Sequence, residues 1–165
     1  MNLISVLLML GFSFLQTGNF PSIGGSNLEG KQFNFPRDFA GKLNVLAISF
    51  NEPERIQAIS WRPAAVRLRQ AFPEFQFYEM PVLPQIYSSP RAVVDTGLRS
   101  GVPNVVLPEV VIRLYVHQDK FLQAIGESKA QTILLLVNQQ GDILWRGYGL
   151  HTSAQEESLK NVLSK

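Results

Sequence analysis

A short polar run follows the most apolar strand expected in this chain. Asn51, Glu52, Glu54 and Gln57 come directly after Leu43–Phe50, which is apolar nearly throughout and typical of a strand covered on both faces. In open α/β sheets, ligands bind where strands hand over to helices. Two interpretations stay open. The residues cap a helix whose dipole favours carboxylates, or they form a polar binding site with Glu54 as a general base that has no evident partner.

The chain of 165 residues contains no cysteine. This excludes disulfides, thiol catalysis and thiolate metal ligands. The two histidines, His117 and His151, fall in different expected elements, and no pair of carboxylates stands at ligand spacing beside them. We therefore expect no metal site and no cofactor. Sequence patterns for phosphate, dinucleotide or nucleophilic-serine chemistry are also missing.

Length and composition predict one folded domain. A chain of 165 residues with 45% hydrophobic content is long enough for one core and short for two. The net charge of only +2 implies a weak surface field, so nucleic acid is not expected as a partner.

Residues 3–15 form an uninterrupted run of apolar and small residues, and the first charged residue is Glu29. The run is shorter than the roughly 20 residues of a membrane-spanning helix, but its length matches the apolar core of a secretory signal. No Lys or Arg precedes it, and no clear cleavage site follows. We interpret residues 1–18 as a signal peptide or membrane tether, which predicts a periplasmic, secreted or membrane-tethered protein. The alternative is a buried N-terminal segment.

The rest of the chain divides into a linker and a domain. Residues 19–30, rich in Gly, Ser and Asn, are predicted to form the linker, and residues 31–165 a single α/β domain. After the central strand we expect one long helix to Phe72, with Ile56, Ile59 and Val66 on its apolar face. Pro63 removes a backbone donor and should kink this helix near Trp61. Trp61 itself lies either in the core or at the surface as an aromatic contact for a peptide.

Further elements follow from the apolar periodicity. An edge strand is expected at 33–35, strands at 75–80 and 110–116, a short helix at 119–125, a hairpin of 132–137 with 143–148, and a final helix from Ser153. Pro81–Pro108 contains five prolines and is interpreted as an insertion. Its Arg91, Asp95 and Arg99 form either a polar pocket over the sheet edge or an ion pair that holds the insertion in place.

This order of elements resembles the thioredoxin fold. The resemblance implies a three-layer α/β sandwich with a central mixed sheet of four to five strands and an insertion before the C-terminal hairpin and helix. The run QTILLLVNQQGD, beginning at Gln131, looks like the closing hairpin of thioredoxins. Against that family, the Cys-x-x-Cys after the central strand is replaced by residues within 52–57, and the cis-proline position by Gln131 or Ala130.

From about Phe20 onward the chain also resembles the bacterial relatives of the mitochondrial ATP synthase assembly factor, a thioredoxin-like family. The similar stretches are Gly30–Lys31, Phe39–Lys42, Gln57–Trp61, Phe77–Pro81, Gly97–Gly101 and Ile143–Arg146. This resemblance implies a role in handling other proteins without redox chemistry.

Together these features predict a redox-inactive, thioredoxin-like protein that binds polypeptides and assists assembly of an envelope or membrane complex. The expected binding groove lies between the 51–57 turn and the 126–131 approach, with the site residues Asn51, Glu52, Glu54, Gln57, Trp61 and Gln131. One alternative is a peroxiredoxin-like or other enzyme that uses Glu54, Arg99 or the histidines. The other is a passive structural component of the envelope.

Overall fold

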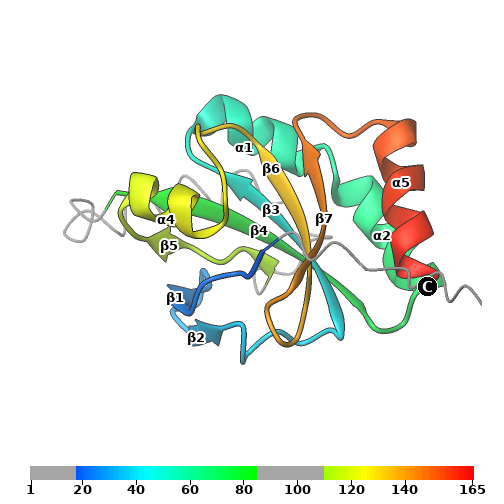
Figure 1. Cartoon of the computed structure of the whole chain (residues 1–165), viewed down its shortest axis with the longest axis horizontal. Coiled ribbons are helices and arrows are strands. Elements are labelled where there is room, and N and C mark those ends of the chain that lie inside the picture. Colours follow the sequence, from blue (N-terminus) through cyan, green and yellow to red (C-terminus); the bar gives the residue numbers. More distant parts are fainter. Residues whose placement is uncertain (1–17, 85–109) are drawn as a thin grey trace, which may run out of the picture.

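The protein is built around a five-stranded mixed sheet. Its structure is a computed structural model in which residues 18–84 and 110–165 are described. The sheet order is β5-β4-β3-β6-β7, and Figure 1 shows its helices on both faces. The strands are β3 (Leu43–Ser49), β4 (Phe75–Leu83), β5 (Leu114–Tyr115), β6 (Ile133–Asn138) and β7 (Ile143–Tyr148). The pairing of β3 is parallel with β4 and antiparallel with β6, which confirms the mixed sheet.

The region expected to be a linker is part of the folded domain. Strand β1 (Ile23–Ser26) pairs antiparallel with β2 (Gln32–Phe35), and Phe20 and Leu28 are buried. The Gly-rich composition led to the wrong prediction of a linker, because glycine is needed here for close packing. A Cβ at Gly25 would come within 3.0 Å of side-chain atoms of both Ile112 and Leu114, so only a residue without a side chain lets the hairpin approach the sheet.

The long helix expected after the central strand is two helices. Helix α1 spans Glu52–Ile59 and α2 spans Arg62–Ala71. The chain breaks at Ser60 and Trp61, near the expected kink. Pro63 occupies the first turn of α2, where its missing N–H costs nothing.

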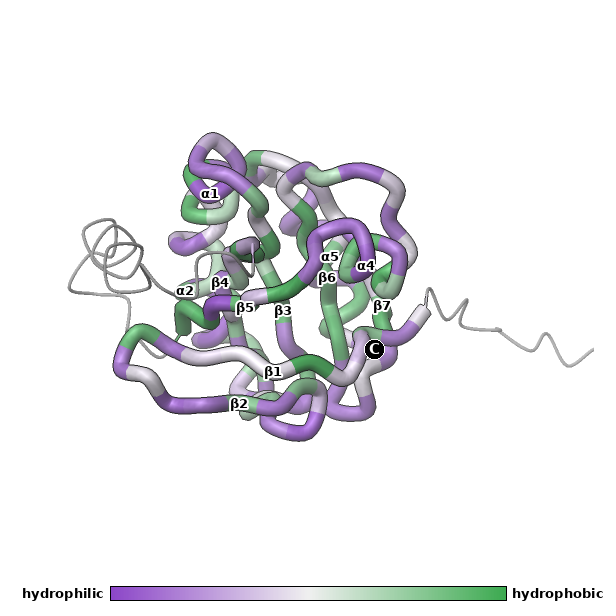
Figure 2. Tube along the Cα trace, turned by 90° about the vertical axis from the view of Figure 1, so that its left-hand side faces the viewer, coloured by the Kyte–Doolittle hydropathy of each residue, from purple (hydrophilic) through white to green (hydrophobic). Residues whose placement is uncertain are grey.

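Alternation along the strands divides the core between the two faces of the sheet. One face carries Leu46 and Ile48 and packs against the β1–β2 hairpin and α4 (Gln118–Ala124). The other carries Val45 and Ala47 and packs against α1, α2 and α5 (Ser153–Leu163). Figure 2 shows the apolar residues concentrated along the central strands, so the architecture has three layers.

Several boundaries differ from the sequence-based ones. Strand β4 continues to Leu83, so Pro81 belongs to a strand and pairs with Ser49 rather than opening the insertion. The third strand is shorter than expected, and α5 is capped by Thr152. The pocket predicted from Arg91, Asp95 and Arg99 lies outside the described residues, as does the apolar run at 3–15. Within the described ranges, no helix has the length and apolarity needed to cross a membrane.

Candidate functional site

The turn between β3 and α1 is closed by hydrogen bonds among its own residues. The Asn51 side-chain oxygen accepts the Glu54 amide N–H at 3.0 Å, and its nitrogen donates to Glu54 Oε1 at 2.8 Å. The other oxygen of Glu54 accepts the Phe50 amide N–H at 2.8 Å. These contacts satisfy donors that the start of a helix leaves free. Both oxygens of Glu54 are thereby engaged, as the capping interpretation expects.

The second acid of this turn is also paired. The Arg55 guanidinium donates to both carboxylate oxygens of Glu52, at 2.7 and 2.6 Å. These bonds lower the pKa of Glu52, chiefly through the hydrogen bond itself. The pair is largely exposed on the Glu52 side and so contributes little to stability. Both carboxylates of this turn are thus engaged in capping or ion pairing, and neither is held against a partner that would make it a general base.

Gln57 joins α1 to the start of β6. Its side-chain oxygen lies 2.7 Å from the Thr132 hydroxyl, which is also 3.0 Å from the Glu54 carbonyl oxygen. Thr132 is buried, and its N-terminal neighbour Gln131 is half-buried. The structure therefore brings Gln57 and Gln131 together where α1 meets the start of β6, although the two residues are far apart in sequence.

The resemblance to thioredoxins expects a cis-proline at Ala130 or Gln131. Among the described residues, the peptide bonds around Gln131 are all trans. The backbone N–H and C=O of Ala130 and Gln131 have no hydrogen-bond partner in the described parts of the chain. Strand β6 begins two residues later, at Ile133. A short stretch of unpaired backbone thus precedes this strand beside α1.

The loop after β7 lies on the other side of the unpaired backbone of Ala130 and Gln131. The Gly149 N–H donates to the Thr132 carbonyl at 3.0 Å, and Ile133 pairs with Tyr148. Continued by two steps, this register places Leu150 opposite Gln131. The loop is tied to the helices as well, because the His151 N–H donates to Ser60 Oγ at 2.9 Å.

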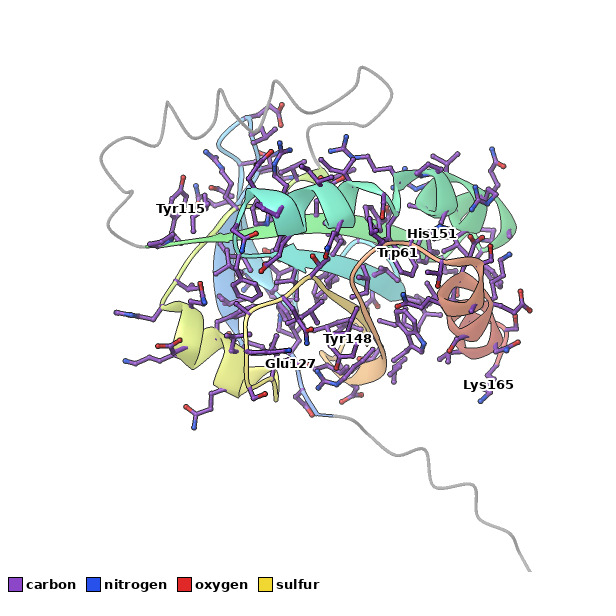
Figure 3. All side chains as sticks on the ribbon, turned by 90° about the horizontal axis from the view of Figure 1, so that it is seen from above. Trp61, Tyr115, Glu127, Tyr148, His151 and Lys165 are labelled. Atoms are coloured by element: carbon purple, nitrogen blue, oxygen red, sulfur yellow. The ribbon has the colours of Figure 1, made fainter. Side chains whose placement is uncertain are left out.

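Trp61 packs beneath this loop in the core and is not available to contact a partner. Only 1% of its surface is exposed, and its indole N–H donates to the Gly149 carbonyl at 3.1 Å. The His151 ring meets it edge-on at 5.1 Å, and Figure 3 shows the two side chains together. Of the two interpretations of Trp61, burial in the core is the one the structure supports. It cannot be a direct contact residue.

Three exposed apolar side chains belong to the elements that adjoin the unpaired backbone. Ile56 on α1 is 58% exposed, Tyr148 at the end of β7 is 42% exposed and Leu150 is 55% exposed. The Tyr148 hydroxyl donates to Glu127 Oε1 at 3.0 Å (Figure 3). This carboxylate and burial together raise the pKa of Tyr148, with burial the larger cause. We name the region the junction surface and define it by Ile56, Gln57, Gln131, Tyr148 and Leu150.

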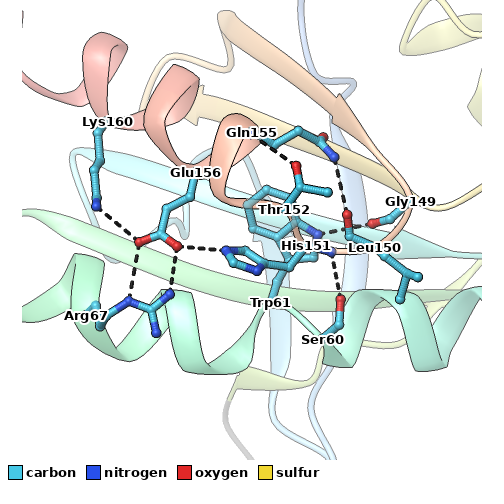
Figure 4. Close-up of polar contacts among 10 residues, drawn as sticks. All are labelled: Ser60, Trp61, Arg67, Gly149, Leu150, His151, Thr152, Gln155, Glu156 and Lys160. Carbon is cyan, nitrogen blue, oxygen red and sulfur yellow. Dashed lines mark hydrogen bonds and ion pairs between the residues drawn. The ribbon is translucent and has the colours of Figure 1, made fainter.

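A buried carboxylate fixes the loop to α5 and α2. Glu156 accepts hydrogen bonds from Arg67 at 2.7 Å and from the His151 ring at 2.7 Å, and it pairs with Lys160 at 3.2 Å (Figure 4). The hydrogen bonds from these three side chains, Arg67 first, hold the pKa of Glu156 at about 2, far below its ordinary value of 4.5. Glu156 is thus ionised at any ordinary pH, and its role is to hold the loop that carries Leu150.

The histidines do not meet the acids of the 51–57 turn. His117 is exposed before α4 and makes no capping bond, while the ring of His151 faces Glu156. No hydrogen bond or ion pair joins Glu54 to either histidine. In the parts of the chain that the structure describes, no three His, Cys, Asp or Glu residues are grouped to hold a metal ion.

Sequence reasoning missed most of the junction surface. It placed Ile56 and Val66 on a buried face, whereas both are more than half exposed. The reason is the helix break, because one continuous stripe was assumed across two short helices. Tyr148 and Leu150 carry no local signal. The order of strands in the expected hairpin was the only feature that could have placed them beside Gln131.

Sequence comparison finds no protein-family model and no curated protein that match this chain. Solved structures do match. One is the thioredoxin domain of a thiol-disulfide oxidoreductase from Bacteroides vulgatus, with a TM-score of 0.58, 14% identity and coverage of 90% of this chain and 97% of that one. A second belongs to the Sco family of cytochrome c oxidase assembly proteins, with a TM-score of 0.63, 14% identity and coverage of 89% and 92%.

A third is an exposed lipoprotein thioredoxin from Streptococcus pneumoniae, with a TM-score of 0.58, 11% identity and coverage of 87% and 98%. The fold is thioredoxin-like. At these identities the likeness establishes the fold and nothing finer. In this thioredoxin-like chain, the turn where the resemblance expects two redox cysteines holds the Asn51–Glu54 cap, and the junction surface lies next to it.

Proposed function

We propose that this chain is a redox-inactive, thioredoxin-like protein that binds other polypeptides in extended form at the junction surface. Its sequence has no cysteine, so the scaffold cannot exchange disulfides through its own thiols. The acids at the helix start are engaged in capping and ion pairing. Contact with a partner is the function that this chemistry leaves to the site.

The unpaired backbone of Ala130 and Gln131 carries the proposal. An N–H and a C=O that lack partners in the described chain match those of an extended peptide, which can add to them as a short strand. The flanking Ile56, Tyr148 and Leu150 then bury apolar area against alternate side chains of the peptide. Main-chain bonds supply affinity for many sequences, and the apolar side chains supply preference.

The setting we propose is an assembly role outside the cytoplasm or at the membrane. The apolar run at 3–15 supports an exported or tethered chain. Two structural neighbours support it by analogy of fold, since one is named an assembly protein and the other an exposed lipoprotein. The resemblance to the ATP synthase assembly factor family points to the same kind of role.

Binding of a labelled, unfolded polypeptide without free thiols tests the proposal. Reduced and carboxymethylated α-lactalbumin is a suitable probe, and fluorescence anisotropy reports its affinity. Ile56→Asp should weaken binding at least tenfold, because it places a charge where apolar area is buried. Val66→Asp is the matched control, since Val66 is a β-branched residue on α2 that is 51% exposed, and it should leave binding unchanged.

The enzyme alternative makes the opposite forecast. If Glu54 acted as a base, Glu54→Gln would abolish turnover of peroxide or esters by the purified chain. Our proposal expects no such turnover in the wild type and an unchanged affinity for the probe in Glu54→Gln, apart from a loss of stability. Equal losses of affinity in Ile56→Asp and Val66→Asp would reject the junction surface as the binding site.

A further inference from the structure

A second surface feature lies on the other side of the sheet from α1 and α2. It is an open groove of about 320 Å³ between β1 and α4, and its walls are mostly apolar. The apolar lining comes from Pro21 and Ile23 on the hairpin side, and from Val116, Phe121 and Ala124 around α4. Ile23 and Val116 are half-buried and Ala124 is exposed. We name it the β1–α4 groove.

The polar lining of the β1–α4 groove is cationic or neutral. Lys120 and His117 complete it, and both are exposed. Within residues 18–84 and 110–165, neither side chain has an ion pair or a hydrogen bond. An uncompensated ammonium beside apolar walls fits an amphiphilic surface with negative headgroups, such as an anionic bilayer.

The position of the groove along the chain also favours a bilayer as its partner. Gly18 lies against the Arg146 guanidinium, which donates to the Ile125 carbonyl at the end of α4 at 2.8 Å. The chain therefore enters the fold beside α4. Leu15, the last residue of the apolar run, is only six residues before Pro21 of the groove, and six extended residues span at most about 22 Å. If the run enters a bilayer, the groove must lie close to that bilayer.

We propose that the β1–α4 groove rests on an anionic lipid surface, with Ile23, Val116 and Ala124 toward the acyl region and Lys120 on the headgroups. The bound domain then has a defined orientation. Figure 1 shows α5 at the far end of the molecule from α4. This contact is separate from polypeptide binding at the junction surface and stands or falls independently of it.

The absence of cysteine permits a direct test on the full chain. A single cysteine replaces Ala124 in one variant and Asn161 on the exposed face of α5 in a matched control, and each is labelled with an environment-sensitive dye such as NBD. Vesicles of phosphatidylcholine, with and without phosphatidylglycerol, are then added, and flotation measures binding. The Ala124 dye should shift to the blue with phosphatidylglycerol vesicles, and the Asn161 dye should not.

Lys120 supplies the electrostatic part of this expectation. Lys120→Ala should weaken binding to anionic vesicles about fivefold at low salt, and added salt should reduce the difference. Asp119→Asn, next to it in sequence but not in the groove lining, is the control and should not weaken binding.

Three results would overturn the proposal. In the first, the chain floats with vesicles while the Ala124 dye does not shift, so the apolar run alone makes the contact. In the second, the dye is already blue-shifted without vesicles and does not change, so another part of the chain covers the groove. In the third, the chain does not bind anionic vesicles.

Discussion

The start of α1 and the start of α5 use their carboxylates in opposite ways. Among the described residues, the Glu54 carboxylate bonds only to Phe50 and Asn51, all within four residues of one another. Glu156 bonds to Arg67 on α2 and to His151 in the loop, and pairs with Lys160 on its own helix. One side of the junction surface is therefore made by local sequence, and the loop on the other side is held by tertiary contacts. This difference teaches which part of the surface can change shape. Local caps re-form whenever the helix forms, whereas the loop depends on the whole fold.

Trp61→Ala is the variant with the largest expected effect, and it tests whether tertiary packing holds the loop. Removing a fully buried indole should lower the free energy of unfolding by about 3–5 kcal/mol, because it leaves a cavity under the Gly149–Thr152 loop. Urea unfolding followed by circular dichroism measures the loss. Trp61→Phe keeps most of the packing but removes the indole donor to Gly149, and should cost clearly less. Equal costs for the two variants would show that packing at this position is unimportant.

Glu156→Gln tests the loop through charge. Since the cations around Glu156 lower its folded-state pKa from 4.5 to about 2, the ionised carboxylate stabilises the fold fully above pH about 4.5. This stabilisation is lost as the pH falls through about 2. The variant should lose about 2 kcal/mol at pH 7, less than the full shift implies, because Arg67 and Lys160 are partly solvated.

The pH dependence is the sharper part of that prediction. The difference in unfolding free energy between wild type and Glu156→Gln should shrink steadily from pH 4.5 to pH 2, because protonation makes the two side chains alike. Denaturant titrations at several pH values measure it. A difference that stays constant across this range would mean that the charge of Glu156 does not hold the loop.

Asn51→Ala tests the local side of the comparison. Loss of the N-cap should cost about 1 kcal/mol, and Asn51→Ser should restore most of it because a hydroxyl also caps. Hydrogen exchange should show faster opening at the first turn of α1 and no change at Gly149 or His151. Faster exchange in the loop would contradict the separation between the local and the tertiary side.

The smallest expected effect is that of Gln155→Ala. The Gln155 side chain accepts the Tyr148 N–H at 3.0 Å and donates to the Tyr148 carbonyl at 3.1 Å, much as a neighbouring strand would. Its removal should cost only about 0.5 kcal/mol but should speed amide exchange at Tyr148 clearly. Unchanged exchange there would show that this side chain does not shield the end of β7.

The sequence predicted the fold more fully than the site. Apolar periodicity placed the central strand, the hairpin of β6 and β7 and the last helix, because each pattern reflects burial that is decided locally. The prediction from periodicity failed where contacts between residues far apart in sequence determine the local structure. The glycines of β1 looked like a linker, yet Gly25 has no side chain because Ile112 and Leu114 lie against it.

The site shows the same limit. Asn51, Glu52, Glu54 and Gln57 were placed correctly beside the end of β3, since capping follows from neighbours in sequence. Leu150 and Tyr148 were not found, because only the register between β6 and β7 places them near Gln131. Trp61 was named as a contact residue or a core residue, and only its burial decides between these roles.

Amide hydrogen exchange at Gln131, measured with and without the unfolded polypeptide probe, tests the central claim most directly. The Gln131 N–H has no hydrogen-bond partner in the described chain, so it should exchange fast in the free protein. Binding of an extended peptide at the junction surface should slow it at least tenfold, because the amide then pairs with the peptide backbone. If the probe binds and Gln131 still exchanges at its free rate, polypeptides are not bound there and the account is contradicted.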